Sequence, residues 1–174
     1  MSLSVCLLPD ASAERAVRRL WERLEDGGVP SLRTHTHGRH VPHLTLASLR
    51  SYRLGDVRTA LGGLPQAPGT EVHFDGLGVF RRSRCWLLPA LTEDLLARQQ
   101  AVVSELSSLS TDLHRHYRPG TWMPHLTLAP RAHLEQLPTI GRLVFEILPL
   151  TVTFPRAALV ETSTGRVHDL PHPL

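Results

Sequence analysis

The chain has 174 residues, 41% of them hydrophobic and 20% charged, which is typical of one globular domain with a substantial core. No apolar stretch approaches the roughly 20 residues of a membrane-spanning helix, and no basic residue precedes the short apolar segment 3–8, so we expect a cytoplasmic protein without a membrane partner. All nineteen basic residues are arginines, which excludes lysyl-nucleotide, pyridoxal Schiff-base and P-loop lysine chemistry. The net charge of +3 is compatible with an anionic partner, although base composition of the coding DNA explains the arginine preference equally well.

The first half of the chain predicts a strand, a long helix, a loop and a second strand. Residues 3–8 form an apolar run, and Asp10 is a suitable N-cap for an amphipathic helix that ends near Gly27. A histidine-rich loop at 31–40 leads into a strand beginning at residue 42. A short helix at 56–61 and a strand from 71 to 80 follow.

The second half repeats this order. Residues 84–88 predict a strand, Thr92 caps a helix to about residue 109, and a second loop rich in histidine and arginine precedes another strand. We then expect a short helix at 132–137, a strand at 145–154 and closing strands at 157–161 and 166–170. The halves, about 1–83 and 84–174, share a β-α-β-α-β order, which indicates a duplication into two pseudo-twofold lobes within a single domain, 1–174.

The hexapeptide PHLTLA occurs twice, at residues 42–47 and 124–129, in equivalent places of the two halves. An identical match of this length arises by chance in about one chain of this size per thousand or fewer. A structural repeat would preserve the core-forming leucines but has no need of the same histidine and threonine. The polar half of the motif therefore points to chemistry.

Side chains alternate along a strand, so His43 and Thr45 share one face, as do His125 and Thr127. If the lobes pack about a twofold axis, two imidazoles and two hydroxyls face each other. One neutral histidine can then act as general base while the other, protonated, acts as general acid on a phosphodiester. The threonine hydroxyls can donate hydrogen bonds to the nonbridging phosphate oxygens.

At these residues the sequence resembles the two-histidine (2H) phosphoesterase superfamily, which includes the bacterial 2′-5′ RNA ligase-like proteins and the cyclic phosphodiesterases. The segment GLGVF at 76–80 is similar to that family's Gly-x-Gly-x-Phe turn. The resemblance implies a bilobal α+β fold and a site that needs no metal. We expect mainly antiparallel sheets around a central cleft, a monomer and no cofactor. It also implies hydrolysis of 2′,3′-cyclic phosphates of nucleotides or RNA, usually to 2′-phosphates, or ATP-independent 2′-5′ RNA ligation.

Four further residues are weaker candidates for substrate contacts. Many ligase-like members carry arginine two residues after the second motif, whereas here Ala129-Pro130 intervenes and Arg131 comes one position later. Trp122 precedes the second motif and has the shape to cover a base, but a large aromatic residue next to a core strand more often serves packing. Arg39 and Arg118 lie in the two loops before the motifs and have the chemistry to hold an RNA backbone, although solvated loop arginines are common.

Two other interpretations of the function remain open. A metal-dependent hydrolase would use the histidines of the first loop, but the sequence has no Cys-x-x-Cys and no carboxylate among them, so we expect no metal site. Those histidines are His35, His37 and His40, beside His43. A non-catalytic module that binds nucleotides or RNA ends on the same cleft is the main alternative; such a module would typically have lost one polar member of the motifs, and none is lost.

Overall fold

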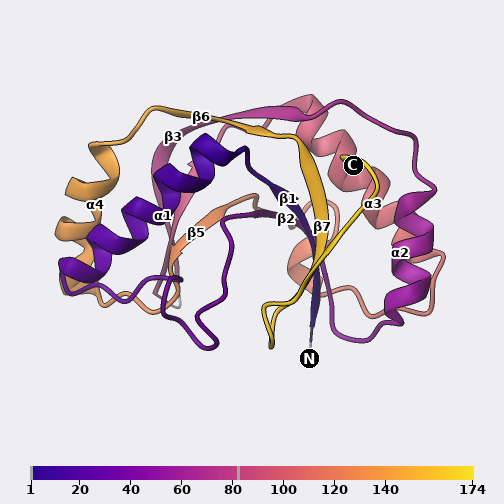
Figure 1. Cartoon of the computed structure of the whole chain (residues 1–174), viewed down its shortest axis with the longest axis horizontal. Coiled ribbons are helices and arrows are strands. Elements are labelled where there is room, and N and C mark those ends of the chain that lie inside the picture. Colours follow the sequence, from indigo (N-terminus) through magenta and orange to yellow (C-terminus); the bar gives the residue numbers. More distant parts are fainter. Residues whose placement is uncertain (1, 82) are drawn as a thin grey trace.

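The computed structural model describes residues 2–81 and 83–174. Two four-stranded antiparallel sheets lie between two pairs of helices, which confirms the predicted α+β fold (Figure 1). Sheet A has the order β2-β1-β7-β8 and contains β1 (Leu3–Leu8), β2 (Leu44–Leu49), β7 (Arg156–Glu161) and β8 (Val167–Asp169). Sheet B has the order β5-β4-β3-β6 and contains β3 (Thr70–Phe80), β4 (Arg84–Pro89), β5 (Leu126–Ala129) and β6 (Leu150–Phe154).

The helices pack outside the sheets. They are α1 (Ala11–Asp26), α2 (Leu54–Gly62), α3 (Glu93–Ser107) and α4 (Leu137–Phe145), with short 3-10 turns η1 (Arg115–Tyr117) and η2 (Leu134–Gln136). The predicted N-caps are confirmed: the Asp10 carboxylate accepts from the Ser12 and Ala13 amides at 2.7 and 3.0 Å, and the Thr92 hydroxyl accepts from the Leu95 amide at 3.2 Å. No helix among the described residues is long and apolar enough to cross a membrane.

The two sequence halves exchange elements. Each half has the predicted β-α-β-α-β order, but β3 of the first half pairs with β4 and β6, while β7 of the second half pairs with β1. Helix α1 packs against α4, β5 and β6, and α3 packs against β2 and α2 (Figure 1). The boundary near residue 83 therefore does not separate the sheets, because strand pairing is decided by long-range packing rather than by the order of elements.

The strand predicted at 145–154 is confirmed only in its second half. Helix α4 continues to Phe145, and the strand begins only at Leu150. Pro138 occupies the first turn of α4, where a missing amide hydrogen is tolerated, and Ile140, Leu143 and Val144 bury one side of the helix. The predicted helix at 132–137 is instead the 3-10 turn η2. A short apolar run rich in β-branched residues fits a buried strand and a buried helix equally well, so its periodicity could not decide between them.

One continuous apolar core joins the two sheets and all four helices. The motif leucines Leu44, Leu46, Leu126 and Leu128 are fully buried in it. The opposite side of each sheet, which we call its inner face, carries the alternate residues. On sheet A the inner face holds a small separate cluster made of Cys6, Leu8, Ala158 and Val160.

Candidate active site

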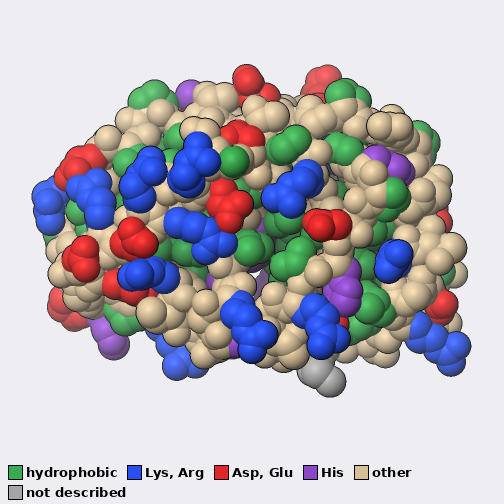
Figure 2. Space-filling view, in the orientation of Figure 1, with side chains coloured by type: hydrophobic (Ala, Val, Ile, Leu, Met, Phe, Trp, Pro, Cys, Tyr) green, Lys and Arg blue, Asp and Glu red, His purple; other side chains and the backbone are tan. Residues whose placement is uncertain are grey.

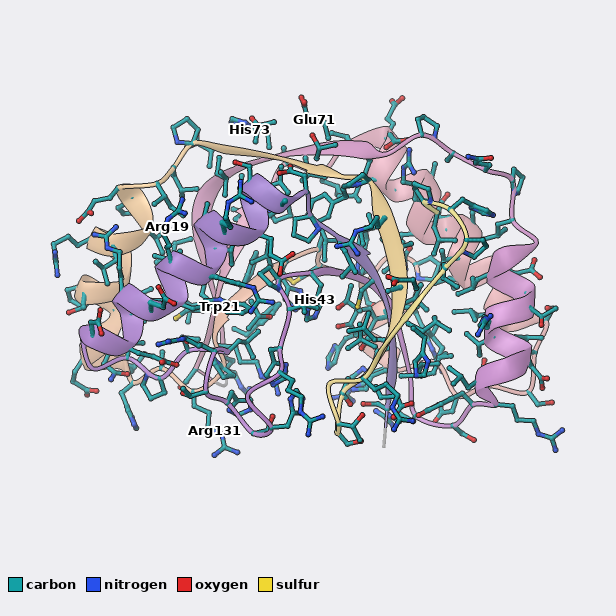
Figure 3. All side chains as sticks on the ribbon, in the orientation of Figure 1. Arg19, Trp21, His43, Glu71, His73 and Arg131 are labelled. Carbon is teal, nitrogen blue, oxygen red and sulfur yellow. The ribbon has the colours of Figure 1, made fainter. Side chains whose placement is uncertain are left out.

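Both motif strands turn their polar residues to the inner faces, because their leucines are buried on the other side. His43 directly precedes β2 and is half-buried, and Thr45 is only 6% exposed. His125 and Thr127 are half-buried in and beside β5. Figure 3 shows His43 near the middle of the molecule, between the helix pairs, and Figure 2 shows a hollow near the middle of the same view.

The two histidine rings are held in the same way. Nδ1 of His43 lies 2.7 Å from the Val41 carbonyl oxygen, and Nδ1 of His125 lies 2.8 Å from that of Met123. A carbonyl only accepts hydrogen bonds, so Nδ1 is the donor in both rings and Nε2 is left for other partners. The proline between each pair keeps the preceding residue extended, which explains why the motif begins with proline.

Burial lowers the pKa of both imidazoles, so both are mainly neutral at pH 7. For His125, the positive charges of His43 and Arg84 lower the pKa further. A positive charge on His43 therefore disfavours a positive charge on His125.

The two threonines have different surroundings. The Thr45 hydroxyl lies 3.7 Å from Sγ of Cys6 and acts on the Tyr117 hydroxyl, whose pKa it lowers against the larger effect of burial. Burial raises the pKa of Tyr117 to about 12 and that of Cys6 to about 12, so both stay protonated at neutral pH. Thr127 lies opposite Trp86 in the strand register, and its hydroxyl makes no hydrogen bond within the described residues. Thr127 is thus the more open of the pair.

An aromatic wall, made of Phe80 and Trp86, borders His125. The ring centroids of Phe80 and Trp86 lie 5.1 and 5.8 Å from that of His125, and 4.9 Å from each other. Gly78 lies opposite Trp86, and a Cβ atom there would be 2.3 Å from the indole ring. The expected turn at 76–80 is therefore wrong: these residues belong to β3, and the glycine makes room for Trp86. Trp86 was not among the residues predicted for the site. The signal that could have found it is its alternation with the buried Cys85 and Leu87 along β4.

Two tryptophans brace the motif backbones. The Trp21 indole, buried on α1, donates to the Thr127 carbonyl oxygen at 3.3 Å, and the Trp122 indole donates to that of Thr45 at 3.0 Å. Gln99 of α3 donates to the Leu46 carbonyl at 3.4 Å and to the Tyr117 carbonyl at 2.8 Å. Trp122 thus connects the loop before the second motif to the strand of the first.

The three candidate arginines are all exposed. Arg131 points outward at the edge of the molecule in Figure 3, yet its charge still lowers the pKa of His35. The Arg39 amide donates to Nδ1 of His37 at 3.0 Å, and the Arg118 carbonyl accepts from Thr121 at 3.0 Å. These contacts involve backbone atoms, so they position the loops but give the guanidinium groups no role.

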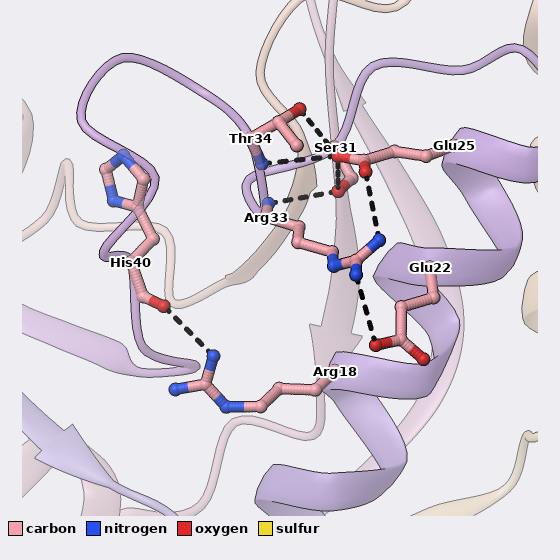
Figure 4. Close-up of polar contacts among 7 residues, drawn as sticks. All are labelled: Arg18, Glu22, Glu25, Ser31, Arg33, Thr34 and His40. Carbon is pink, nitrogen blue, oxygen red and sulfur yellow. Dashed lines mark hydrogen bonds and ion pairs between the residues drawn. The ribbon is translucent and has the colours of Figure 1, made fainter.

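The histidine-rich loop is tied to α1 (Figure 4). Glu25 accepts from the Ser31 and Thr34 hydroxyls, both at 2.8 Å, and Arg33 lies 3.5 Å from Glu25. The Arg18 guanidinium donates to the His40 carbonyl at 3.3 Å. This anchoring holds the loop beside the first motif.

The rings of this loop are close together. The centroids of His37 and His40 are 4.2 Å apart, and those of His35 and His40 are 5.9 Å apart. Burial, followed by the positive charges of His37, His43 and His35, lowers the pKa of His40 to about 4. In the part of the chain that the structure describes, no three His, Cys, Asp or Glu side chains converge to hold a metal ion.

The profile of the 2′-5′ RNA ligase superfamily matches residues 8–166. No curated protein matches significantly. The fold is similar to TT0787 of Thermus thermophilus, with 16% identity over 99% of this chain and 96% of that one and a TM-score of 0.64. It is also similar to Escherichia coli LigT complexed with 3′-AMP, with 19% identity over 98% and 95% and a TM-score of 0.61. Usb1 of Kluyveromyces marxianus has 15% identity over 98% and 97% and a TM-score of 0.55.

Proposed function

The chain belongs to the 2′-5′ RNA ligase superfamily, as its two motifs predicted, and we propose that it hydrolyses the 2′,3′-cyclic phosphate of a nucleotide or RNA end without a metal ion. The observation that carries this proposal is the matched pair His43 and His125. Each ring is anchored through Nδ1, neither Nε2 has a hydrogen-bond partner among the described residues, and the positive charge of His43 lowers the pKa of His125. Two such imidazoles are what a general base and a general acid require.

In the proposed reaction, the neutral imidazole takes a proton from water through Nε2 as the water oxygen bonds to phosphorus. The bond from phosphorus to the ribose 3′ oxygen breaks, and that oxygen receives a proton from the other imidazolium, which leaves a 2′-phosphate. An anionic phosphate between the rings raises their pKa values and so permits one of them to be protonated. The hydroxyls of Thr45 and Thr127 donate to the nonbridging oxygens, where negative charge builds up.

The superfamily favours one related activity. If a 5′-hydroxyl of RNA replaces water, the same residues catalyse ATP-independent 2′-5′ ligation with the same proton transfers. Escherichia coli LigT is described as complexed with 3′-AMP and with ATP, which supports a nucleotide as the ligand of this fold. The alternative of a non-catalytic nucleotide-binding module retains the ligand but not the turnover.

The test is incubation of the protein with nucleoside 2′,3′-cyclic phosphates and a short RNA with a cyclic phosphate end, in the presence of EDTA. We expect 2′-phosphate products, and a loss of about a hundredfold or more in turnover for His43→Ala and for His125→Ala. His73→Ala is the matched control, because His73 is exposed on β3 away from the motifs (Figure 3). Wild-type rates in both motif variants would favour the non-catalytic binding module. Activity that needs an added metal would favour a metal-dependent hydrolase.

A further inference from the structure

Three segments meet at one end of sheet B. The Leu32 amide donates to the Leu128 carbonyl at 3.0 Å, which fixes the start of the histidine-rich loop to β5. The Ala132 amide donates to the Ser83 carbonyl at 2.8 Å, which fixes the segment after β5 to the start of β4. His35, Arg84 and Arg131 are the basic residues that these segments carry to this end.

The strand register puts Arg84 on the inner face. Cys85 and Leu87 are buried in the core, so Arg84 and Trp86 project from the other side of β4. Arg84 pairs with Phe80, whose ring contacts His125. Two strand residues span roughly 6 to 7 Å, so Arg84 lies about one nucleotide unit along the wall from the Trp86–His125 contact.

This group of cations has no acidic partner among the described residues. Neither Arg84 nor Arg131 lies within 4.0 Å of a carboxylate oxygen, whereas Arg18, Arg23 and Arg33 each form an ion pair. After burial, the charges of Arg131 and Arg84 lower the pKa of His35. The two guanidinium groups disfavour a positive charge on His35, and an anion placed among the three side chains would relieve that repulsion.

We propose that Arg84, with Arg131 and His35 at its edge, forms a second anion site that binds a phosphate on the 5′ oxygen of the nucleoside whose terminal phosphate lies between the two histidines. The proposal rests on the proposed function, since it takes the motif pair as the site of the terminal phosphate. A guanidinium binds phosphate oxygens in a bidentate, charge-assisted manner, which suits Arg84 for the task. The 5′ phosphate belongs either to a free nucleoside bisphosphate or to the preceding link of an RNA chain.

Calorimetric titration with ligands that are not cleaved tests the site. The three ligands are adenosine 3′-phosphate, adenosine 3′,5′-bisphosphate and a diadenosine dinucleotide with a 3′-phosphate. We expect the wild-type protein to bind at least one of the two-phosphate ligands about tenfold or more tightly than the monophosphate. Arg84→Gln should reduce that difference to about twofold or less. A larger gain for the dinucleotide identifies a chain phosphate, and a larger gain for the bisphosphate identifies a free one.

The matched control is Arg19→Gln, which removes the same charge from the exposed side of α1 (Figure 3) and should keep the full difference. Three results would overturn the proposal: equal affinity of the wild-type protein for all three ligands, binding of none of them, or a difference in affinity that survives Arg84→Gln. A wild-type protein that prefers two phosphates but turns over no cyclic phosphate would reject the proposed hydrolysis and leave the second anion site supported.

Discussion

Gly78→Ala should destabilise the protein by pressing on Trp86. The added Cβ would lie 2.3 Å from Cζ2 and 2.4 Å from Cε2 of the indole, whereas carbon atoms in contact prefer roughly 3.5 to 4.0 Å. Gly78 does not have a positive φ, so alanine suits the backbone and the clash is the whole effect. Trp86 is 4% exposed and has to move by more than about 1 Å, which is overpacking of the kind that costs about 1 to 3 kcal/mol.

Urea denaturation followed by circular dichroism measures this cost, and turnover of a cyclic phosphate should fall as well, because Trp86 contacts His125. Gly55→Ala makes the same chemical change in α2, where a Cβ meets nothing within 4 Å, and should leave stability equal or up to about 1 kcal/mol higher. Adding Trp86→Leu should reduce the cost of Gly78→Ala, since the two residues are coupled. A Gly78→Ala variant as stable and active as the wild type would refute the steric role of the glycine.

Three further outcomes follow from the site. Burial lowers the pKa of His43 and of His125, so the bell-shaped pH dependence of kcat/KM should be centred below 6.5; a bell centred above pH 7.5 would contradict this assignment. Thr45→Val and Thr127→Val should each lower turnover less than the histidine variants and leave the shape of the pH profile unchanged, because a hydroxyl does not titrate in this range. Folding lowers the pKa of His40 from 6.5 to about 4, so its contribution to stability is present above pH 6.5 and is lost as the pH falls towards 4. The full shift corresponds to about 3 kcal/mol, which solvent screening of this half-buried ring reduces to about 1 to 2 kcal/mol. Urea denaturation between pH 7 and 4 should therefore show a smaller loss of stability for His40→Asn than for the wild type, and parallel curves would exclude the effect.

The sequence alone was sufficient for the local features of the chain. Capping residues such as Asp10 and Thr92 mark helix starts because they bond to amides two or three residues away. The alternation in each hexapeptide separates core leucines from site residues because neighbouring strand residues face opposite sides. These interactions join residues close in the chain, so periodicity reports them. Where the local pattern was ambiguous, at residues 145–149, the strand prediction was wrong, whereas residues 150–154 do form a strand.

Only the tertiary structure decided which elements meet. Trp21 braces Thr127 from 106 residues away, and the exchange of β3 and β7 between the sheets has no counterpart in the order of elements. The influence of Thr45 on Tyr117 and the place of Arg84 beside the aromatic wall likewise depend on strand register and loop anchoring. Such contacts form because they bury apolar surface and satisfy polar groups across the whole chain, and periodicity over a few residues carries no information about them.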